Sequence, residues 1–309
     1  ANLQLETGVI DSAIAEVKNW NRSHTNKLGI KLRVFAGIYT PQWVKDDVGS
    51  TTLDFEDSDF DGSYPHYWTQ EYRTRYAQLH HALATKYDSV GVIKEVAISG
   101  CMIKNADMNR SPNEWQNINR LIDDGLTWQK DKGCQQWQID TVASKWDRTK
   151  VAVARPHFRK FVKVTSQPSD TEWPISKTIM QEMVDTCRAH GNCIIGENSL
   201  ERWDMEHNAF TDPFHPIYYV CGKYLENYEP KAPVYFQTGA FVDDNGTLTH
   251  QVLYWAIQNC GDSILKMIEL PQLKKFNQYD VKYANDNNVA KTSYLGSDKM
   301  QSKRDKLKQ

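Results

Sequence analysis

Short apolar runs alternate with amphipathic stretches along most of the chain. The apolar runs predict six strands, over residues 31–37, 92–100, 149–155, 192–196, 233–238 and 263–270. The amphipathic stretches predict helices over residues 10–20, 65–87, 114–123, 134–146, 175–189, 217–228 and 247–259. In the longest helix, apolar residues recur at spacings of three and four, which gives one apolar face. These residues are Trp68, Tyr72, Tyr76, Leu79 and Leu83.

Strands that are each followed by a helix favour a parallel sheet, and strands that are apolar throughout favour a sheet covered on both faces. A doubly wound sheet usually has a glycine-rich phosphate turn after its first strand, and the sequence has no such motif. We therefore predict an α/β fold, a (β/α)8 TIM barrel that lacks its first strand or strands, or has them truncated. A weak strand is expected at residues 2–5. The barrel would span residues 1–276, and residues 277–309 would form a polar C-terminal extension.

Composition and charge are those of a globular protein. The chain has 309 residues, of which 40% are hydrophobic, and a formal net charge of -2. A nearly neutral chain has no electrostatic footprint for nucleic acid or for an anionic membrane surface. No stretch approaches the roughly 18 consecutive apolar residues of a membrane helix, so we expect neither nucleic-acid binding nor membrane insertion.

The cysteines and sequons bear on the compartment. None of the 6 cysteines forms a C-x-x-C pair. Cys187 and Cys193 bracket a turn between a helix and a strand, close enough to form a disulfide, and buried free thiols are the alternative. N-x-S/T sequons at Asn21, Asn109 and Asn245 are typical of exported chains. Since neither an initiator Met nor a signal peptide stands at the first residue, the chain would be a mature product, a trimmed form or part of a longer protein.

No metal or cofactor is expected. The acidic loop from Asp46 to Tyr64 lacks the glycine and the terminal glutamate of an EF-hand, so a solvated loop is favoured over a calcium site. A calcium-binding structural protein is the weakest of three hypotheses. His80 and His81 lie inside a predicted helix without the H-E-x-x-H spacing of a zinc site.

The segments that follow the predicted strands are rich in aromatic, amide, imidazole and carboxylate side chains. In a barrel, the site lies at these carboxyl ends. Aromatic rings stack on sugar rings, and polar groups bond sugar hydroxyls. The substrate-binding candidates are Tyr39, Trp43, Arg155, His157, Asn198, Trp203, His207 and Gln237.

Glycoside hydrolysis requires two carboxyl groups, and three candidates follow predicted strands. They are Asp107, Glu197 and Glu269. Each has a structural alternative: Asp107 caps a turn, Glu197 pairs with an arginine, and Glu269 caps a final helix. For Trp43 the alternative is core packing.

Several short motifs, taken in order, resemble the large clan of retaining (β/α)8 glycosidases. They include Tyr39-Thr-Pro-Gln-Trp43, Pro65 to Tyr72 and Ile93 to Gly100. The sequence more closely resembles a poorly characterised glycosidase-like group of bacterial extracellular proteins, through Gly100-Cys-Met102 with Ala106-Asp107, Asn198-Ser-Leu200, Phe236-Gln-Thr238 and Ile268-Glu-Leu-Pro271. This resemblance implies a barrel, a carbohydrate ligand and an extracellular or cell-surface location.

The sequence departs from that clan at both catalytic positions. The clan has an Asn-Glu pair after its fourth strand, where this chain has Ser99-Gly100, and a nucleophilic Glu after its seventh, where this chain has Gln237. A neutral amide cannot form the usual glycosyl ester.

Two hypotheses follow from these departures. In the first, the protein is a glycoside hydrolase with Asp107 as general acid and Glu269, or Glu197, as nucleophile or base. In the second, it is a pseudoenzyme, a carbohydrate-binding or structural module of a cell-surface or filamentous assembly. That module would be part of a longer parent chain or would assemble with itself.

Overall fold

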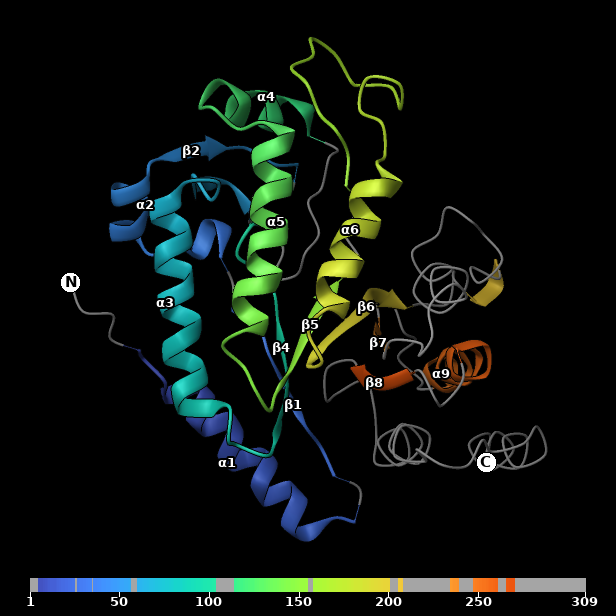
Figure 1. The fold of residues 1–309 in the computed structure, drawn as a ribbon. Coiled ribbons are helices and arrows are strands. Elements are labelled where there is room, and N and C mark those ends of the chain that lie inside the picture. Colours follow the sequence, from blue (N-terminus) through green and yellow to red (C-terminus); the bar gives the residue numbers. More distant parts are fainter. Residues whose placement is uncertain are drawn as a thin grey trace. The chain divides into compact units, whose positions relative to one another are not determined.

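The computed structural model describes ten stretches of the chain, and the chain divides into two compact units (Figure 1). The described residues are 5–25, 27–34, 36–56, 60–103, 114–154, 158–200, 205–207, 234–238, 247–260 and 265–269. The first unit comprises residues 1–7 and 31–193, and the second comprises residues 8–30 and 194–309. The predicted polar extension and the predicted helix at 217–228 lie outside the described residues.

Three strands and three long helices make up the centre of the first unit. The strands are β1 (Ile30–Leu32), β4 (Ile93–Ala97) and β5 (Lys150–Ala154), in the order β1-β4-β5. Strands β4 and β5 are parallel, with Ala97 opposite Ala152. The helices are α3 (Gln70–Tyr87), α5 (Trp128–Ala143) and α6 (Lys177–Arg188), which lie side by side in that order (Figure 1).

Each of these helices begins at a hydroxyl side chain. The caps are Thr69, Thr127 and Ser176, whose oxygens accept the N–H of the residue three positions later. Such caps satisfy amide groups that have no partner within the helix. The prediction that a helix begins at residue 65 therefore missed its start, because the cap stands at Thr69 and the helix begins at Gln70.

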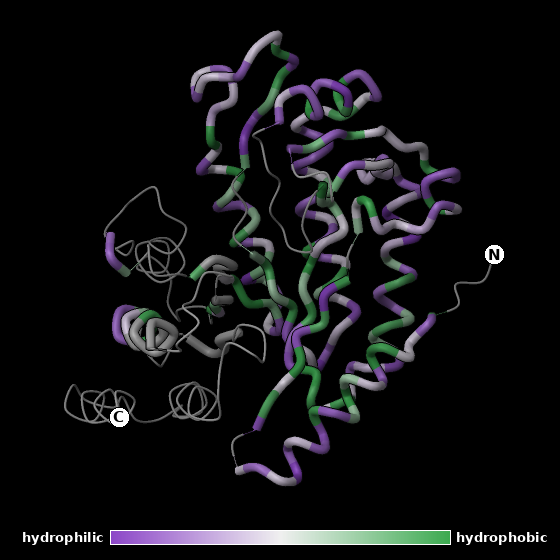
Figure 2. The backbone as a smooth tube through the Cα atoms, turned by 180° about the vertical axis from the view of Figure 1, so that it is seen from behind, coloured by the Kyte–Doolittle hydropathy of each residue, from purple (hydrophilic) through white to green (hydrophobic). Residues whose placement is uncertain are grey.

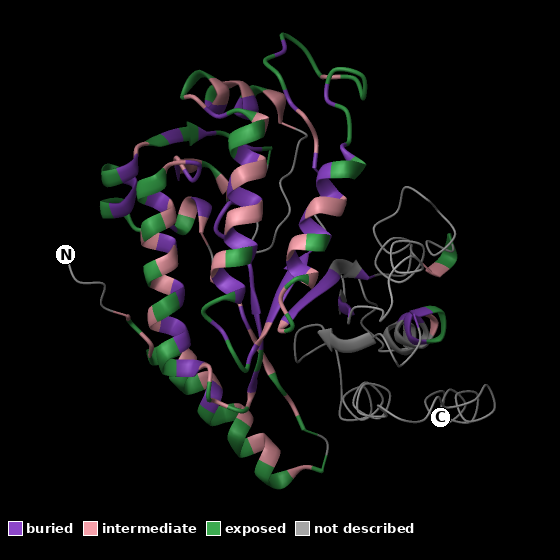
Figure 3. Ribbon diagram, in the orientation of Figure 1, coloured by how far each residue is buried: buried purple, intermediate pink, exposed green. Residues whose placement is uncertain are grey.

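The core of this unit lies between the strands and the apolar sides of the helices. Strands β4 and β5 are buried along most of their length, and the helices alternate buried with exposed positions (Figure 3). Hydrophobic and hydrophilic residues alternate along the same helices (Figure 2). On α3, the buried face carries Tyr72, Tyr76, Leu83 and Tyr87, and the predicted apolar stripe is confirmed at the first three of these.

The predicted acidic loop is instead an ordered segment. After the short helix η1 (Gly37–Tyr39) and helix α2 (Gln42–Val48), an antiparallel ribbon forms from β2 (Ser50–Leu53) and β3 (Gly62–Pro65). We predicted a solvated loop here because each of these short strands contains few apolar residues. Helix α4 (Trp115–Asp123) packs on β2 and covers it. The prediction was wrong because this contact comes from a distant part of the sequence.

Two acidic side chains between the strands of this ribbon have protein partners. Arg120 forms an ion pair with Asp54 at 2.5 Å, and Asp61 accepts the N–H of Phe55 at 2.6 Å. Among the described residues, no group of three His, Cys, Asp or Glu side chains could hold a metal ion.

In the second unit, parallel strands form a ladder in the order β6-β7-β8. They are β6 (Cys193–Leu200), β7 (Val234–Thr238) and β8 (Leu265–Glu269). Two helices, α1 (Gly8–Ser23) and α9 (Thr247–Cys260), belong to the same unit.

The prediction of an α/β fold is confirmed, but the prediction of a (β/α)8 TIM barrel is wrong. Among the described residues, the β1-β4-β5 and β6-β7-β8 ladders together contain six strands, whereas a closed barrel has eight. Between β1 and β4, the chain forms the antiparallel ribbon in addition to helices, which is not the simple alternation of a barrel. The barrel prediction failed because an apolar run indicates only that a strand is buried on both faces. Whether a sheet closes into a barrel depends on the number and tilt of its strands.

Two disulfides are present in the first unit. Cys187 is bonded to Cys193, as the spacing predicted, and Cys101 is bonded to Cys134, with Cα–Cα distances of 5.3 and 5.8 Å. Cys260 of the second unit is also disulfide-bonded. None of the described helices is long and apolar enough to cross a membrane.

The sequon at Asn21 has a structural role. The Asn21 side-chain amide donates to the carbonyl of Leu28 at 2.9 Å, and its oxygen accepts the Leu28 N–H at 2.7 Å. These two bonds hold the turn that follows α1. Asn109 and Asn245 lie outside the described residues.

The turn before β5 depends on one carboxylate. Asp88, directly after α3, accepts the backbone N–H groups of Asp147, Arg148 and Thr149 at 2.8–3.1 Å. Burial alone would raise the pKa of Asp88, but the hydrogen bonds from these amides outweigh it and lower the pKa. The ionised form is therefore stabilised in the folded protein.

We predict that Asp88→Asn lowers the free energy of unfolding at pH 7 by about 1–3 kcal/mol, because a charged acceptor of several amides is lost. The folded pKa is depressed, so this contribution is complete above the unfolded value of about 4 and is lost as pH falls through the folded value. Urea unfolding at pH 7 and at pH 3 measures it. Asp147→Asn is the control, since that residue contributes its backbone N–H and its side chain is exposed. An equal effect of both variants at pH 7 would contradict the assignment.

Candidate functional site

The candidate residues belong to segments that follow strands of the two units. Those after β1, β4 and β5 belong to the first unit, and those on β6, β7 and β8 belong to the second.

Where β4 ends, hydrogen bonds satisfy the buried polar groups of the chain. Ser99 Oγ donates to the carbonyl of Val34, and Ser99 N donates to Tyr76 Oη at 3.2 Å. Tyr72 Oη donates to the carbonyl of Gly100 at 2.6 Å. Ser99 is completely buried, so its hydroxyl serves the backbone and does not face a ligand.

Cys101 belongs to the same buried, hydrogen-bonded segment. Its N–H donates to Gln138 Oε1 at 2.9 Å, and its carbonyl accepts from Gln135 Nε2 at 2.6 Å. The disulfide to Cys134 ties the same residue to α5. A buried backbone requires such partners, since an unsatisfied polar group is costly in the interior. Burial raises the pKa of Tyr76 to about 12, so its phenol is neutral at physiological pH.

His80 belongs to the core and does not serve as a proton donor. It is completely buried on α3, and its Nδ1 accepts from Trp146 Nε1 at 3.2 Å. Burial lowers the pKa of His80 to about 3, so the imidazole is neutral near pH 7. The sequence-based exclusion of a zinc site at His80 is consistent with this environment.

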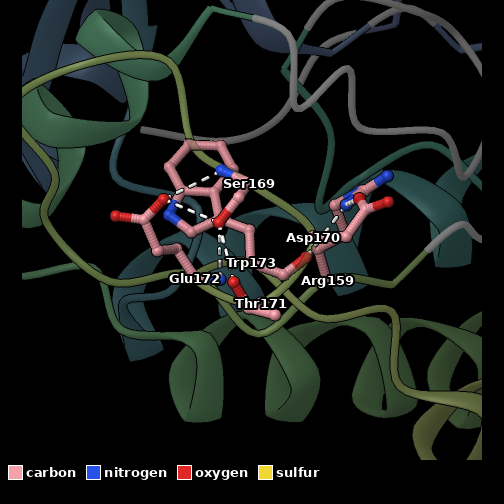
Figure 4. Close-up of polar contacts among 6 residues, drawn as sticks. All are labelled: Arg159, Ser169, Asp170, Thr171, Glu172 and Trp173. Atoms are coloured by element: carbon pink, nitrogen blue, oxygen red, sulfur yellow. Dashed lines mark hydrogen bonds and ion pairs between the residues drawn. The ribbon is translucent and has the colours of Figure 1, made fainter.

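A long connection, held in place by hydrogen bonds, follows β5. The chain doubles back between Phe158 and Ser176, with the N–H of Lys160 donating to the carbonyl of Pro174 at 3.0 Å. Arg159 Nη1 donates to Asp170 Oδ1 at 2.5 Å and to the carbonyl of Trp173 at 2.9 Å (Figure 4). Arg159 thus closes the base of the connection.

The tip of this connection is an ordered turn. The N–H and the hydroxyl of Ser169 both donate to Glu172 Oε2, at 2.9 and 2.8 Å (Figure 4). The hydrogen bonds from the Ser169 backbone and side chain lower the pKa of Glu172. Trp173 anchors the turn, since it is buried, stacks edge-on against Phe161 and donates from Nε1 to the carbonyl of Val162 at 2.9 Å. These carboxylates are structural.

Two large aromatic side chains remain exposed after β1. Tyr39, at the end of η1, is 59% exposed, and Trp43, in the first turn of α2, is 43% exposed. Core packing was the structural alternative for Trp43, and this exposure argues against it. Gln42 and Asp46 lie on the same helix, exposed, with Gln42 Nε2 donating to Asp46 Oδ1 at 2.8 Å. We call Tyr39, Gln42, Trp43 and Asp46 the aromatic surface.

Helix α3 contributes a cation to the aromatic surface. The guanidinium carbon of Arg75 lies 5.6 Å from the centroid of the Trp43 ring, within the range of a cation–π interaction. Arg75 Nε and Nη2 both donate to Asp47 Oδ2, at 3.1 and 2.9 Å. The sequence analysis did not identify Arg75 or Asp47, because they lie far apart in the sequence and meet through the packing of α2 on α3.

In the second unit, the strand register brings candidate positions together. Gln237 of β7 and Glu269 of β8 are direct neighbours in the parallel ladder. Glu197 of β6 stands opposite Phe236, one residue before Gln237. Asn198 follows at a shift in the β6–β7 register.

The remaining candidates are placed less completely. His207 is exposed. The residues outside the described part of the chain are Asp107, Arg155, His157 and Trp203.

The packing at the end of β4 generates a prediction about Gly100. A Cβ on this residue would lie 2.6 Å from Tyr76 Cε1 and Cζ. We expect Gly100→Ala to lower the free energy of unfolding by about 1–3 kcal/mol, because the buried ring has no room to move. Chemical denaturation measures this, with Gly91→Ala as control, since nothing lies within 4 Å of a Cβ there. If Gly100→Ala is as stable as Gly91→Ala, the end of β4 is open enough to admit a side chain.

Comparison with known proteins gives no family for the chain: no protein-family model and no curated protein sequence matches it.

Proposed function

We propose that this protein binds an oligo- or polysaccharide outside the cell or at the cell surface. The observation that carries the proposal is the exposure of Tyr39 and Trp43, at 59% and 43%, on consecutive short helices after β1. Large aromatic side chains are normally buried, and exposed ones commonly mark binding surfaces.

The chemistry of the aromatic surface suits a sugar. A pyranose ring has a face of C–H groups that packs on a flat aromatic ring, and hydroxyls at its rim that require hydrogen-bond partners. Gln42 and Asp46 supply an amide and a carboxylate on the same helix turn as Trp43.

The extracellular location is supported by the disulfides. Bonds such as Cys101–Cys134 and Cys187–Cys193 persist in oxidising compartments and are rare in a reducing cytosol.

Binding without hydrolysis is favoured by the end of β4. The resemblance to retaining glycosidases implied an acid/base glutamate there, but Ser99 and Gly100 fill the position with backbone contacts. Two described titratable side chains of this region, His80 and Tyr76, are buried and neutral.

We predict that Trp43→Ala and Tyr39→Ala each weaken the binding of a soluble oligosaccharide by about five- to thirtyfold, because central aromatic contacts are each worth roughly 1–2 kcal/mol. A glycan array identifies the ligand, and isothermal titration calorimetry then gives the affinities. Val162→Ala is the matched control, since this side chain is 53% exposed on the connection after β5. Unchanged affinity in both aromatic variants would remove the aromatic surface from the binding site.

A second candidate function, glycoside hydrolysis, draws on the second unit. Gln237 and Glu269 are neighbours near the ends of parallel strands, where enzymes of α/β class carry their active sites. In this case Glu269 acts as nucleophile or base, with Glu197 as the alternative carboxylate.

For this second function we expect Glu269→Gln to reduce turnover by about a hundredfold or more, as is usual when an acid or base is lost. Release of reducing sugar from the oligosaccharide found on the array measures it, with Glu56→Gln as the exposed control. If the wild-type protein binds the sugar and releases no product, the hypothesis of a hydrolase is excluded and the hypothesis of a binding protein is supported.

A further inference from the structure

Trp43 is held by a chain of two contacts. Asp47 lies four residues after Trp43 on α2, and residues at this spacing share a helix face. Arg75, on the neighbouring helix α3, reaches both: it donates two N–H groups to one Asp47 oxygen and places its guanidinium over the indole. The three side chains therefore form a bridge between α2 and α3.

Arg75 lies over the Trp43 ring, and 43% of Trp43 remains exposed, so part of the indole is accessible to a ligand. A planar guanidinium stacks on an aromatic face and is itself oriented when two of its nitrogens are bonded. A side chain that is already oriented loses less conformational entropy when a ligand binds.

The two cationic side chains near the Trp43 ring, Arg75 and Lys45, each have an oxygen partner. Arg75 faces the Asp47 carboxylate, with side chains 32% and 41% exposed, so its charge is compensated at the surface. Lys45 Nζ donates to the carbonyl of Ile38 at 2.8 Å, and burial lowers the pKa of Lys45. Asp46 remains as an exposed carboxylate, which would repel an anionic sugar.

We propose that Asp47 and Arg75 are positioning residues that hold the Trp43 indole as a one-sided stacking platform for a neutral sugar ring. The proposal rests on the proposed function and adds two features, the positioning pair and the class of sugar. Neither residue contacts the ligand directly. Asp47 acts through Arg75, and Arg75 acts through the orientation of Trp43.

The positioning role predicts a pattern among variants. Arg75→Gln weakens binding by about five- to tenfold, because it removes the cation over the ring. Asp47→Asn weakens binding by about threefold, and adding it to Arg75→Gln has no further effect, because Asp47 acts through Arg75. Arg75→Lys retains the charge but not the planar fork and has an intermediate affinity.

The control for this series is Arg120→Gln. Arg120 also forms an ion pair with an aspartate, Asp54, at 2.5 Å, but it supports the ribbon β2–β3 and lies over none of the described aromatic rings. We expect its affinity to equal that of the wild type. Thermal melting of every variant separates a loss of folding from a loss of affinity.

The probes for calorimetry are cellohexaose, xylohexaose, mannohexaose and chitohexaose as neutral chains, and hexagalacturonate and a heparin hexasaccharide as anionic chains. A neutral chain as the tightest ligand, with the variant pattern above, supports the proposal. A tighter anionic ligand, or full affinity in folded Arg75→Gln while Trp43→Ala loses binding, overturns it and leaves the proposed function standing. Full affinity in Trp43→Ala and Tyr39→Ala, or binding of none of the six probes, overturns both.

Discussion

The requirement that a buried backbone satisfies its polar groups shapes the first unit. Where β4 ends, residues Ser99 to Cys101 are buried, and their amides and carbonyls must find partners inside the protein. Tyr72 and Tyr76 of α3 and two glutamines of α5 provide them, and the Cys101–Cys134 bond fixes the same contact covalently. The two helices are thereby held against the sheet. The buried segment from Ser99 to Cys101 therefore serves the packing of this unit.

In the connection after β5, the polar side chains of Arg159, Ser169 and Glu172 bond to other groups of the same connection. The segment after β1 differs, since Tyr39 and Trp43 are exposed to solvent and Arg75 of α3 lies over the Trp43 ring. An exposed, oriented aromatic ring beside polar groups is the feature of this unit that best fits a sugar. In the second unit, the neighbouring positions of Gln237 and Glu269 keep hydrolysis as a separate hypothesis.

The sequence predicted the elements that have a strong local signal. Strands β4 and β5 and helix α3 were recognised from apolar runs and from a three- and four-residue repeat, and Cys187–Cys193 from its short spacing. The ribbon β2–β3 was missed because its short strands are largely polar and are stabilised by α4, far away in the sequence. The barrel was predicted wrongly because local apolar runs do not determine how many strands pair or whether a sheet closes. Arg75 and Asp47 could not be recognised either, because their meeting depends on how α2 packs on α3.

The stacking of a neutral sugar on the Trp43 indole is best tested by a crystal structure of the protein with the neutral hexasaccharide that it binds most tightly. We expect a pyranose ring with its C–H face on the indole side opposite Arg75, Arg75 still bonded to Asp47, and Tyr39 against the same sugar chain. A sugar bound elsewhere, with Trp43 still exposed to solvent, would contradict it.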